Sequence, residues 1–353
     1  MKKVTMQQIA DHLGVSKFVV SRALSGKGGV NEMTKERVIQ AASQLGYFNQ
    51  KNGYVKNIRS AASTVAIPAG KQSVLVLMPN IRSQNKESLY WGKVLEGISD
   101  ELEDQNLGMI IVSEPRTDVM MNIINPEGIL GMIGVGQIAS SLLLEVHRSG
   151  LPMVLVDHED PLIPSDTIFA NNVDGMYRMV NYLIGLGHRE LYFLGNVNFS
   201  RSFQDRWLGF RSALEENDLG VQPHKDGMLL LDSIETGGFD EALENWLLTR
   251  KQTKSLPTAL VCANDLIAIH TVRILQKLGL RVPEEVSVTG FDNIDDAARA
   301  EPQITTVNVA KEQLGRRAVT KLLDRLADSN RAVEKWLISA ELLYRHSASK
   351  PRE

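Results

Sequence analysis

Residues 5–45 constrain the fold more than any other stretch, because their pattern divides into three short helices separated by two turns. Thr5 can cap the first helix, and Gln8 three residues later can complete a capping box. Gly14 then allows a tight turn, after which Ser16 is placed to cap the second helix. The apolar side chains of the first helix recur at helical spacing, as Met6, Ile9, Ala10 and Leu13.

The second helix, residues 17–25, separates its side chains into two faces. One face is apolar and suits a small core: Val19, Val20, Ala23 and Leu24. The other face is cationic, aromatic and hydroxylated: Lys17, Phe18, Ser21, Arg22 and Ser25. Such a face beside a glycine-containing turn is typical of a helix-turn-helix that enters the major groove of DNA. The pattern alone leaves open a small helical bundle whose basic residues are solvated surface.

The order of residues 4–47 is more specific than the pattern. V-T-M-Q-Q-I-A-D-H-L-G-V-S-x-x-V-V-S-R-A-L-S-G, followed by T-K-E-R-V-I-Q-A-A-S-Q-L-G-Y, resembles the N-terminal headpiece of the LacI/GalR (lactose-repressor) family of bacterial transcription regulators. The resemblance implies a homodimer or higher oligomer that binds a pseudo-palindromic double-stranded DNA operator.

Eight headpiece residues are candidates for DNA contacts. Three of them are expected to read bases: Lys17, Phe18 and Arg22. Arg22 is expected to pair with guanine edges, and Phe18 to pack on thymine methyl groups. Thr5, Ser16 and Ser21 are expected to contact phosphates and fix the register. Two further residues complete the candidate set, and the second of them is also expected to cap the third helix: Ser25 and Thr34.

Length and charge indicate a small basic head on a larger acidic body. A chain of 353 residues exceeds the size at which one hydrophobic core stops growing, so two or three domains are expected. Residues 1–60 hold ten Lys and Arg against three acidic residues, a net charge of +7. The rest holds 29 basic residues (39 minus 10) and 39 acidic ones (42 minus 3), a net charge of −10. This division indicates a polyanionic partner for the head only.

Several classes of protein are disfavoured by the sequence. The single Cys262 excludes an intrachain disulfide and a cysteine-rich zinc site, and the histidines lack metal-ligand spacing. No G-x-S-x-G, H-E-x-x-H or P-loop pattern occurs, so we expect neither an enzyme nor a cofactor. No secretory apolar run follows the first residues, and residues 128–144 are too short to span a membrane. We therefore expect a cytoplasmic protein.

The headpiece, residues 1–48, is followed by a basic linker, residues 49–72, that contains no acidic residue. In the family a short hinge helix with an A-R-x-L pattern places a leucine in the minor groove, but G-Y-V-K stands here at residues 53–56. Two interpretations remain open. Tyr54, Val55 or Ile58 supplies the wedge in another register, or the segment is a flexible tether that only gathers phosphate contacts.

From residue 73 onward, strand-like and helical runs alternate, which predicts parallel sheets covered on both faces. We expect strands at residues 74–78, 109–112, 129–135, 153–156, 191–194, 259–262 and 286–289. Helices are expected at residues 89–105, 140–146, 174–186, 205–216 and 265–278. The resemblance extends through residues 183–195, 261–268 and 282–293, and it implies a periplasmic-binding-protein-like α/β body, residues 73–353, of two parallel-sheet subdomains. We place these at residues 73–158 with 291–322, and at residues 159–290 with 323–345.

Polar residues follow several of the expected strands, at the sheet edge where small ligands bind in such folds. The resemblance implies that Arg206 and Asp292 hydrogen-bond the hydroxyl groups of an effector, with Asn264 and Asp157 as additional contacts. It also places Trp91 where its ring could stack on a sugar. Arginine donors, carboxylate acceptors and an aromatic face suit a polyhydroxyl ligand. Asp265, by contrast, is expected to cap its helix.

These features together predict a DNA-binding transcriptional regulator, expected to be a repressor, controlled by a small carbohydrate in the cleft of the body. A regulator whose ligand strengthens DNA binding, as a corepressor or activator, is the alternative, because residue types do not reveal the sign of the coupling. A sugar-binding protein without a regulatory role is a further alternative.

Overall fold

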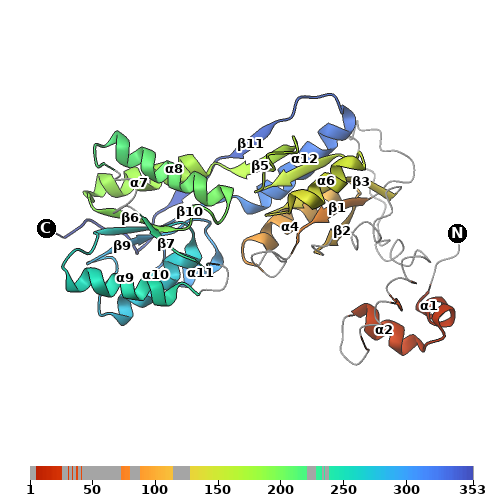
Figure 1. The fold of residues 1–353 in the computed structure, drawn as a ribbon, viewed down its shortest axis with the longest axis horizontal. Helices are drawn as coiled ribbons and strands as arrows, with labels where there is room; N and C mark the ends of the chain where they lie inside the picture. Colours follow the sequence, from red (N-terminus) through yellow and green to blue (C-terminus); the bar gives the residue numbers. More distant parts are fainter. Residues whose placement is uncertain are drawn as a thin grey trace. The chain divides into compact units, whose positions relative to one another are not determined.

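The computed structural model describes residues 5–25, 31, 34, 37–38, 41, 73–79, 88–113, 128–220, 228–232, 234 and 238–352. The chain forms two compact units, Met1–Thr64 and Val65–Glu353 (Figure 1). The predicted linker, residues 49–72, lies outside the described residues, and with it the choice between a hinge helix and a tether.

The first unit begins with a helix-turn-helix, α1 (Met6–Leu13) and α2 (Lys17–Ser25). The capping box is confirmed, because the amide of Gln8 donates to Thr5 Oγ1 at 3.3 Å and the amide of Thr5 donates to Gln8 Oε1 at 2.8 Å. Gly14 reverses the chain with a φ of 66°, a left-handed conformation that glycine adopts without strain. Ser16 Oγ then accepts the amide of Val19 at 3.3 Å, which confirms Ser16 as the cap of α2.

A small core holds this unit together, and it joins the buried sides of both helices to the third predicted helix. Its members are buried apolar residues: Ile9, Ala10, Val20, Ala23, Val38 and Ala41. The prediction that Thr34 caps the third helix is wrong. Thr34 is already helical, and its amide donates to Asn31 Oδ1 at 2.7 Å, so Asn31 caps this turn.

The first subdomain of the body is built on a six-stranded parallel sheet in the order β11-β5-β4-β3-β1-β2. Its strands are β1 (Ser73–Leu77), β2 (Gly108–Val112), β3 (Ile129–Val135), β4 (Met153–Val156), β5 (Asp166–Ala170) and β11 (Lys335–Ile338). Side chains alternate along β1. Val74 and Val76 join the core beneath α4 (Trp91–Asp104) and α12 (Lys311–Ala327), whereas Leu75 and Leu77 pack with α6 (Ser140–Arg148).

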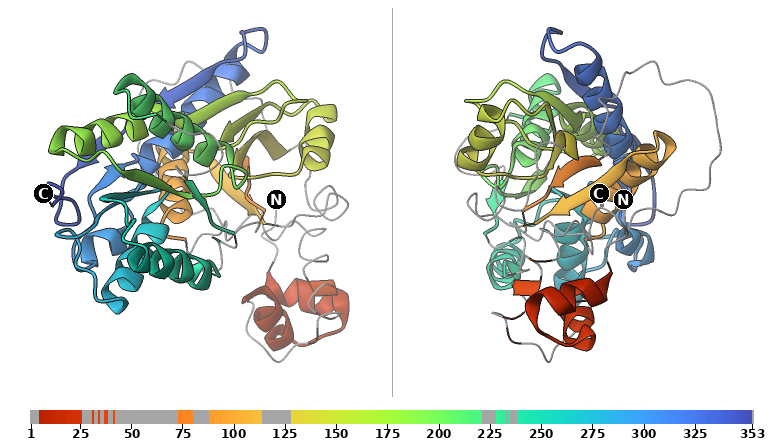
Figure 2. Two further views of the ribbon diagram at one scale, coloured as in Figure 1. Left: turned by 60° about the vertical axis from the view of Figure 1, so that its left-hand side comes forward. Right: turned by 90° about the vertical axis from the view of Figure 1, so that its right-hand side faces the viewer.

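The second subdomain is built on a four-stranded parallel sheet in the order β7-β6-β8-β9. Its strands are β6 (Leu191–Gly195), β7 (Met228–Leu230), β8 (Ala259–Cys262) and β9 (Ser287–Thr289). One face is covered by α7 (Asn172–Leu186) and α8 (Arg201–Glu216), the other by α9 (Asp240–Gln252) and α10 (Asp265–Lys277), with α11 (Asp295–Arg299) beside them (Figures 1 and 2). A small antiparallel pair, β10 (Thr306–Asn308) with β12 (Glu341–Leu343), packs on α7.

The predicted subdomain boundaries are wrong, because the chain crosses between the subdomains near residues 171, 309 and 339 rather than at 158/159, 290/291 and 322/323. β5 pairs with β4, and β11 pairs with β5, so residues 159–170 and 323–338 belong to the first subdomain. Residues 291–308 stay with the second subdomain, because the amide of Asp265 donates to the carbonyl of Phe291 at 2.8 Å and the amide of Gly290 donates to the carbonyl of Thr305 at 2.9 Å. The strand β5 escaped prediction because it begins with Asp166 and Thr167, polar residues that are nevertheless buried.

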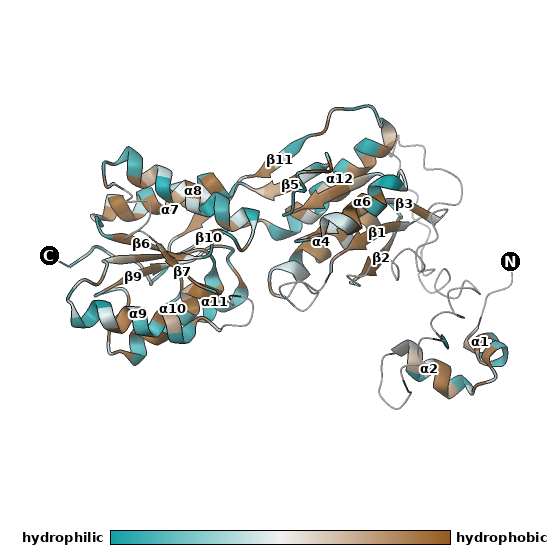
Figure 3. Ribbon diagram, viewed as in Figure 1, coloured by the Kyte–Doolittle hydropathy of each residue, from teal (hydrophilic) through white to brown (hydrophobic). Residues whose placement is uncertain are grey.

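Hydropathy follows these layers, with apolar strands at the centre of each subdomain and polar positions concentrated on the outer faces of the helices (Figure 3). Within the described ranges, every helix is too short or too polar to cross a membrane.

Candidate functional site

A cavity of about 640 Å³ lies between the two subdomains of the body. The first subdomain contributes side chains that follow its strands and open α4: Tyr90, Trp91, Gln137, Asp157, His158 and Glu159. The second contributes the start of α8 and the ends of its strands: Phe199, Arg201, Ser202, Phe203, Arg206, Asn264, Asp292 and Ile294. All five residues predicted for an effector therefore line this one cavity, at the carboxyl ends of the strands where parallel sheets bind ligands.

The buried pair of Arg206 and Asp292 forms the floor of the cavity, with Arg206 at its centre. Helix α8 starts at Arg201, four residues earlier than predicted, because Ser200 Oγ accepts the amide of Phe203 at 3.2 Å. Arg206 therefore lies in the second turn, where it is only 3% exposed. Its guanidinium lies 3.9 Å from the ring centroid of Phe291. This stacking on an aromatic face adds to its hydrogen bonds.

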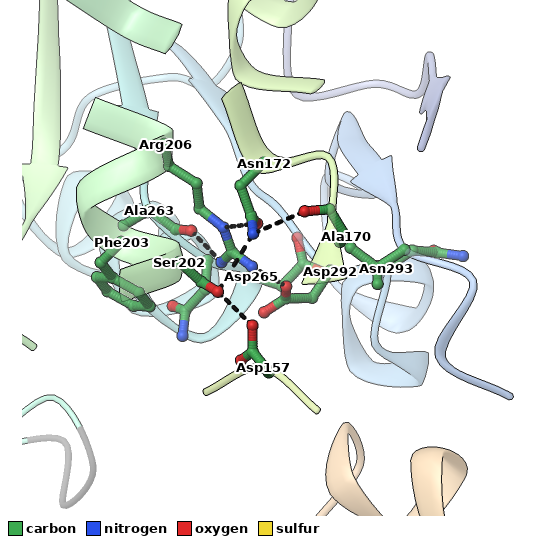
Figure 4. A network of polar contacts seen from close by, with 12 residues as sticks. Asp157, Ala170, Asn172, Ser202, Phe203, Arg206, Ala263, Asp265, Asp292 and Asn293 are labelled. Atoms are coloured by element: carbon green, nitrogen blue, oxygen red, sulfur yellow. Dashed lines mark hydrogen bonds and ion pairs between the residues drawn. The ribbon is translucent and has the colours of Figure 1, made fainter. Parts of the chain in front are cut away.

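Each nitrogen of the Arg206 guanidinium donates a hydrogen bond (Figure 4). Nε donates to Asn172 Oδ1 at 2.9 Å, Nη1 to the carbonyl of Ala263 at 2.7 Å, and Nη2 to Asp292 Oδ1 at 2.8 Å. The sequence did not indicate Asn172, which follows the unpredicted strand β5 and ties the first crossover of the chain to the floor. Burial with these partners fixes the orientation of both Arg206 and Asp292.

Asp292 is held by its backbone as well as by Arg206. It has a φ of 109°, and Asn293 after it has a φ of 54°, so two adjacent residues occupy the left-handed region. Lys311 Nζ, at the start of α12, donates to the carbonyls of Asp292 at 2.7 Å and Asn293 at 3.1 Å. Burial raises the pKa of Asp292, and the charges of Arg206 and Lys311 oppose that rise. Sequence reasoning missed Lys311, which links this site to the crossover near residue 309.

Asn264, and not Asp265, caps α10, and Asn264 also lines the cavity as predicted. The prediction that Asp265 caps α10 is wrong, because Asn264 is the cap and its Oδ1 accepts the amide of Ile267 at 3.0 Å. Asp265 is fully buried and accepts bonds from Thr306 Oγ1 at 2.5 Å and the amide of Ile294 at 2.9 Å. Burial raises the pKa of Asp265 to about 7. Asp265 therefore fastens the segment that carries Asp292 to the sheet.

Asp157 lies on the opposite wall, directly after β4, with a φ of 54°. Its Oδ1 accepts a hydrogen bond from Ser202 of α8, so this contact joins the two subdomains (Figure 4). Burial raises the pKa of Asp157 to about 6, although Ser202 and Arg206 oppose the rise. A second contact across the cavity is the ion pair between Arg201 and Glu159, at 3.1 Å.

Aromatic side chains form the remaining wall. Trp91, predicted as a stacking surface, opens α4 and packs edge-on against Tyr90, with ring centroids 4.8 Å apart. Burial is the main cause that raises the pKa of Tyr90, so its hydroxyl stays protonated. The cavity thus combines a charged, hydrogen-bonded floor with an aromatic side, a composition suited to a ring that carries hydroxyl groups.

Five of the DNA-contact candidates are exposed on the helix-turn-helix: Thr5, Ser16, Lys17, Phe18 and Ser21. Arg22 is half-buried beside them. Lys17 and Ser21 are exposed, Phe18 is 66% exposed, and the Arg22 guanidinium lies 5.3 Å from the Phe18 ring centroid. Thr5 and Ser16 use their hydroxyls as helix caps. The side chain of Ser25 lies outside the described residues. The exposed side of α2 thus presents an aromatic ring beside cationic side chains.

Comparison with known proteins identifies both units. The lacI family of bacterial regulatory proteins matches residues 5–50, and a periplasmic binding protein-like domain matches residues 180–348. The chain belongs to the LacI family. It is therefore a transcriptional regulator with a helix-turn-helix DNA-binding domain and a periplasmic-binding-protein-like body.

Similarity to individual members extends over the whole chain. The HTH-type transcriptional regulator DegA of Bacillus subtilis (strain 168) is 26% identical over 360 residues, which cover 98% of each protein. The structure of the regulator CelR with cellobiose matches with a TM-score of 0.69 and 22% identity, covering 98% of this chain and 99% of CelR. The lac repressor dimer bound to its operator matches with a TM-score of 0.66 and 22% identity, covering 99% and 100%.

Proposed function

We propose that this LacI-family regulator is a repressor that binds a pseudo-palindromic operator as a dimer and is released by a small polyhydroxyl effector in the cavity of the body. The observation that carries the proposal is the buried Arg206–Asp292 pair, which closes the floor of a ligand-sized cavity on a chain whose other unit is a helix-turn-helix.

On the DNA side, the exposed face of α2 supplies the reading surface. Arg22 presents a planar guanidinium that matches the guanine edge, and Phe18 presents an apolar ring for thymine methyl groups. Lys17 reads bases beside them, while Ser21 contacts the backbone. Thr5 and Ser16, with hydroxyls already engaged as caps, place helix N-termini against phosphates, because the amides there attract anions. Ser25 and Thr34 complete the proposed contact set.

On the effector side, the ligand lies between Trp91 and the polar floor. Asp157 and Asp292 accept hydrogen bonds from its hydroxyl groups, the side-chain amide of Asn264 adds a donor, and Arg206 holds Asp292 in place. A carbohydrate agrees with the CelR structure, which holds cellobiose in a body of the same fold.

Regulation requires that the ligand favour one arrangement of the two subdomains over another. Asn172 and Lys311 tie the cavity floor to the first two crossover segments, so a ligand that changes the floor acts directly on the chain that joins the subdomains. A coupling of about 1–3 kcal/mol between effector and operator suffices for ordinary regulation.

A gel shift on DNA that flanks the regulator's own gene tests this proposal, with and without a panel of mono- and disaccharides. We expect a discrete shift that at least one sugar removes. A sugar that strengthens the shift would assign the corepressor mode instead, and a chain that binds sugars but no DNA fragment in preference to random duplex would refute the regulatory role.

A further inference from the structure

We propose that the cavity selects an uncharged polyhydroxyl ligand and rejects its phosphorylated or carboxylated derivatives, and that His158 accepts a hydroxyl hydrogen of this ligand beside Asp157. This inference rests on the proposed function, which leaves the charge of the effector open. It draws on two observations, the balance of charge along the lining and a buried ring nitrogen of His158.

Among the described residues that line the cavity, each cation is already paired with a carboxylate. Two cations, Arg201 and Arg206, face three carboxylates, Asp157, Glu159 and Asp292, so this described lining carries a net charge of −1 (2 minus 3). Arg206 is almost fully buried, and each of its nitrogens already donates within the protein. These bonds use three of the five N–H groups of the guanidinium, and its charge is already paired with Asp292, so a phosphate that approached Arg206 would compete with that carboxylate.

The other lining cation is engaged as well. Arg201 Nε donates to Asp205 Oδ1 at 2.7 Å, and Nη1 contacts Glu159 Oε2 at 3.1 Å. Lys335 reaches the same Glu159 carboxylate. Asp157 differs from these residues because, in the described part of the chain, the neutral hydroxyl of Ser202 donates to it. A carboxylate bonded in this way repels an anion and accepts a hydroxyl hydrogen.

His158 adds a neutral acceptor next to Asp157. The side chain lines the cavity, and its ring hydrogen-bonds the backbone of Ile138. Within the described ranges its Nε2 is buried without a hydrogen-bond partner. Burial lowers the pKa of His158, which keeps the ring neutral, and a neutral ring that donates through Nδ1 presents Nε2 as an acceptor. A buried polar atom without a partner is costly, and a turn of the ring toward the cavity would let a ligand hydroxyl satisfy it.

The proposed selection against anionic ligands is tested on the full chain by thermal shift with matched neutral and anionic pairs: glucose and glucose 6-phosphate, glucose and glucuronate, ribose and ribose 5-phosphate, cellobiose and cellobionate. We expect at least one neutral member to raise the Tm, and its anionic counterpart to bind at least about tenfold more weakly, because like charges repel in a buried site. An anionic member that stabilises the chain more than its neutral counterpart would overturn the inference, as would a panel in which no neutral member stabilises it.

The role of His158 is tested by calorimetric titration of the stabilising neutral sugar into His158→Leu and His158→Gln. For the leucine variant, the loss of one neutral hydrogen bond predicts that Kd rises by roughly threefold to tenfold. The glutamine variant keeps an acceptor and should recover part of the affinity. His147→Leu, at an exposed position on α6, is the matched control and should leave the Kd unchanged.

An unchanged Kd in His158→Leu, with a Tm equal to that of the unsubstituted chain, would overturn the assignment of His158. These binding measurements contain no DNA. A neutral sugar that binds through His158 without altering operator binding would therefore refute the proposed regulation and leave the present inference standing.

Discussion

Two arginines in the two units of the chain show how differently the same side chain is used. Arg22 lies at the surface of α2 beside the exposed Lys17 and Phe18. Arg206 is 3% exposed, and its nitrogens bond to Asn172, Ala263 and Asp292. A surface charge contributes little to stability and can serve an intermolecular contact. A buried charge must keep its partners. Substitutions on the exposed face of α2 should therefore change recognition alone, whereas substitutions in the cavity floor should change stability as well.

The largest effect is expected for Arg206→Ala, which leaves Asp292 buried without its cation. Breaking a buried ion pair from one side costs about 3–5 kcal/mol, so chemical denaturation should show a loss of this order together with loss of the effector response. Arg201→Ala removes an arginine from the same helix whose side chain is 49% exposed, and it should cost less than about 1 kcal/mol. Equal losses in the two variants would remove the distinction between buried and surface arginines.

The next largest effect is expected for Arg22→Ala. Loss of a bidentate base contact predicts about 1–3 kcal/mol weaker binding to the operator and less discrimination against random duplex. Fluorescence anisotropy with both duplexes measures this difference, and Arg148→Ala on α6 of the body serves as control. Operator preference that survives Arg22→Ala would show that this side chain does not read bases.

The Asp157→Asn substitution tests the cost of a buried charge on the cavity wall through the pH dependence of the Tm. Burial raises the pKa of Asp157 from 3.8 to about 6, so the folded chain holds this proton more tightly than the unfolded chain. The ionised carboxylate then costs stability that is fully felt above pH 6 and disappears as the pH falls toward 4. The asparagine variant should melt about 2–4 °C higher than the unsubstituted chain at pH 8 and at nearly the same temperature at pH 4. A Tm difference independent of pH would contradict this assignment.

The smallest effect is expected for Phe18→Ala. Since the ring is 66% exposed, its removal should change the free energy of unfolding by no more than about 0.5 kcal/mol. Operator affinity should nevertheless fall by about 1 kcal/mol if the ring packs on a thymine methyl group. The same anisotropy and denaturation measurements apply. A stability loss above 2 kcal/mol would place Phe18 in the core of the headpiece.

Much of this structure could be predicted because its signals are local. Strands such as β3 and β8 are uninterrupted apolar runs, and the capping box of α1 is visible as Thr5 with Gln8. The five predicted effector residues meet in one cavity because strand ends in a parallel sheet share an edge.

What could not be predicted depends on long-range pairing. β5 begins with the buried Asp166, which is tolerable because its partners come from much later in the chain: Arg325 Nε donates to Oδ2 at 2.8 Å, and the amide of Glu334 donates to Oδ1 at 2.8 Å. Lys311 and Asn172 gain their roles from the crossovers, whose positions follow from β5 and β11. His158 had no spacing signal, although its place directly after Asp157 at a strand end could have marked it.

The central claim is that α2 reads DNA and the cavity binds the effector, so that one property can be removed without the other. The most direct test is to measure, on Arg22→Ala, both operator affinity by anisotropy and the Tm increase caused by the neutral sugar that stabilises the unsubstituted chain. We predict that operator preference is lost while the full Tm increase remains. Retained operator preference, or a lost Tm increase in a variant whose body is folded, would contradict this account.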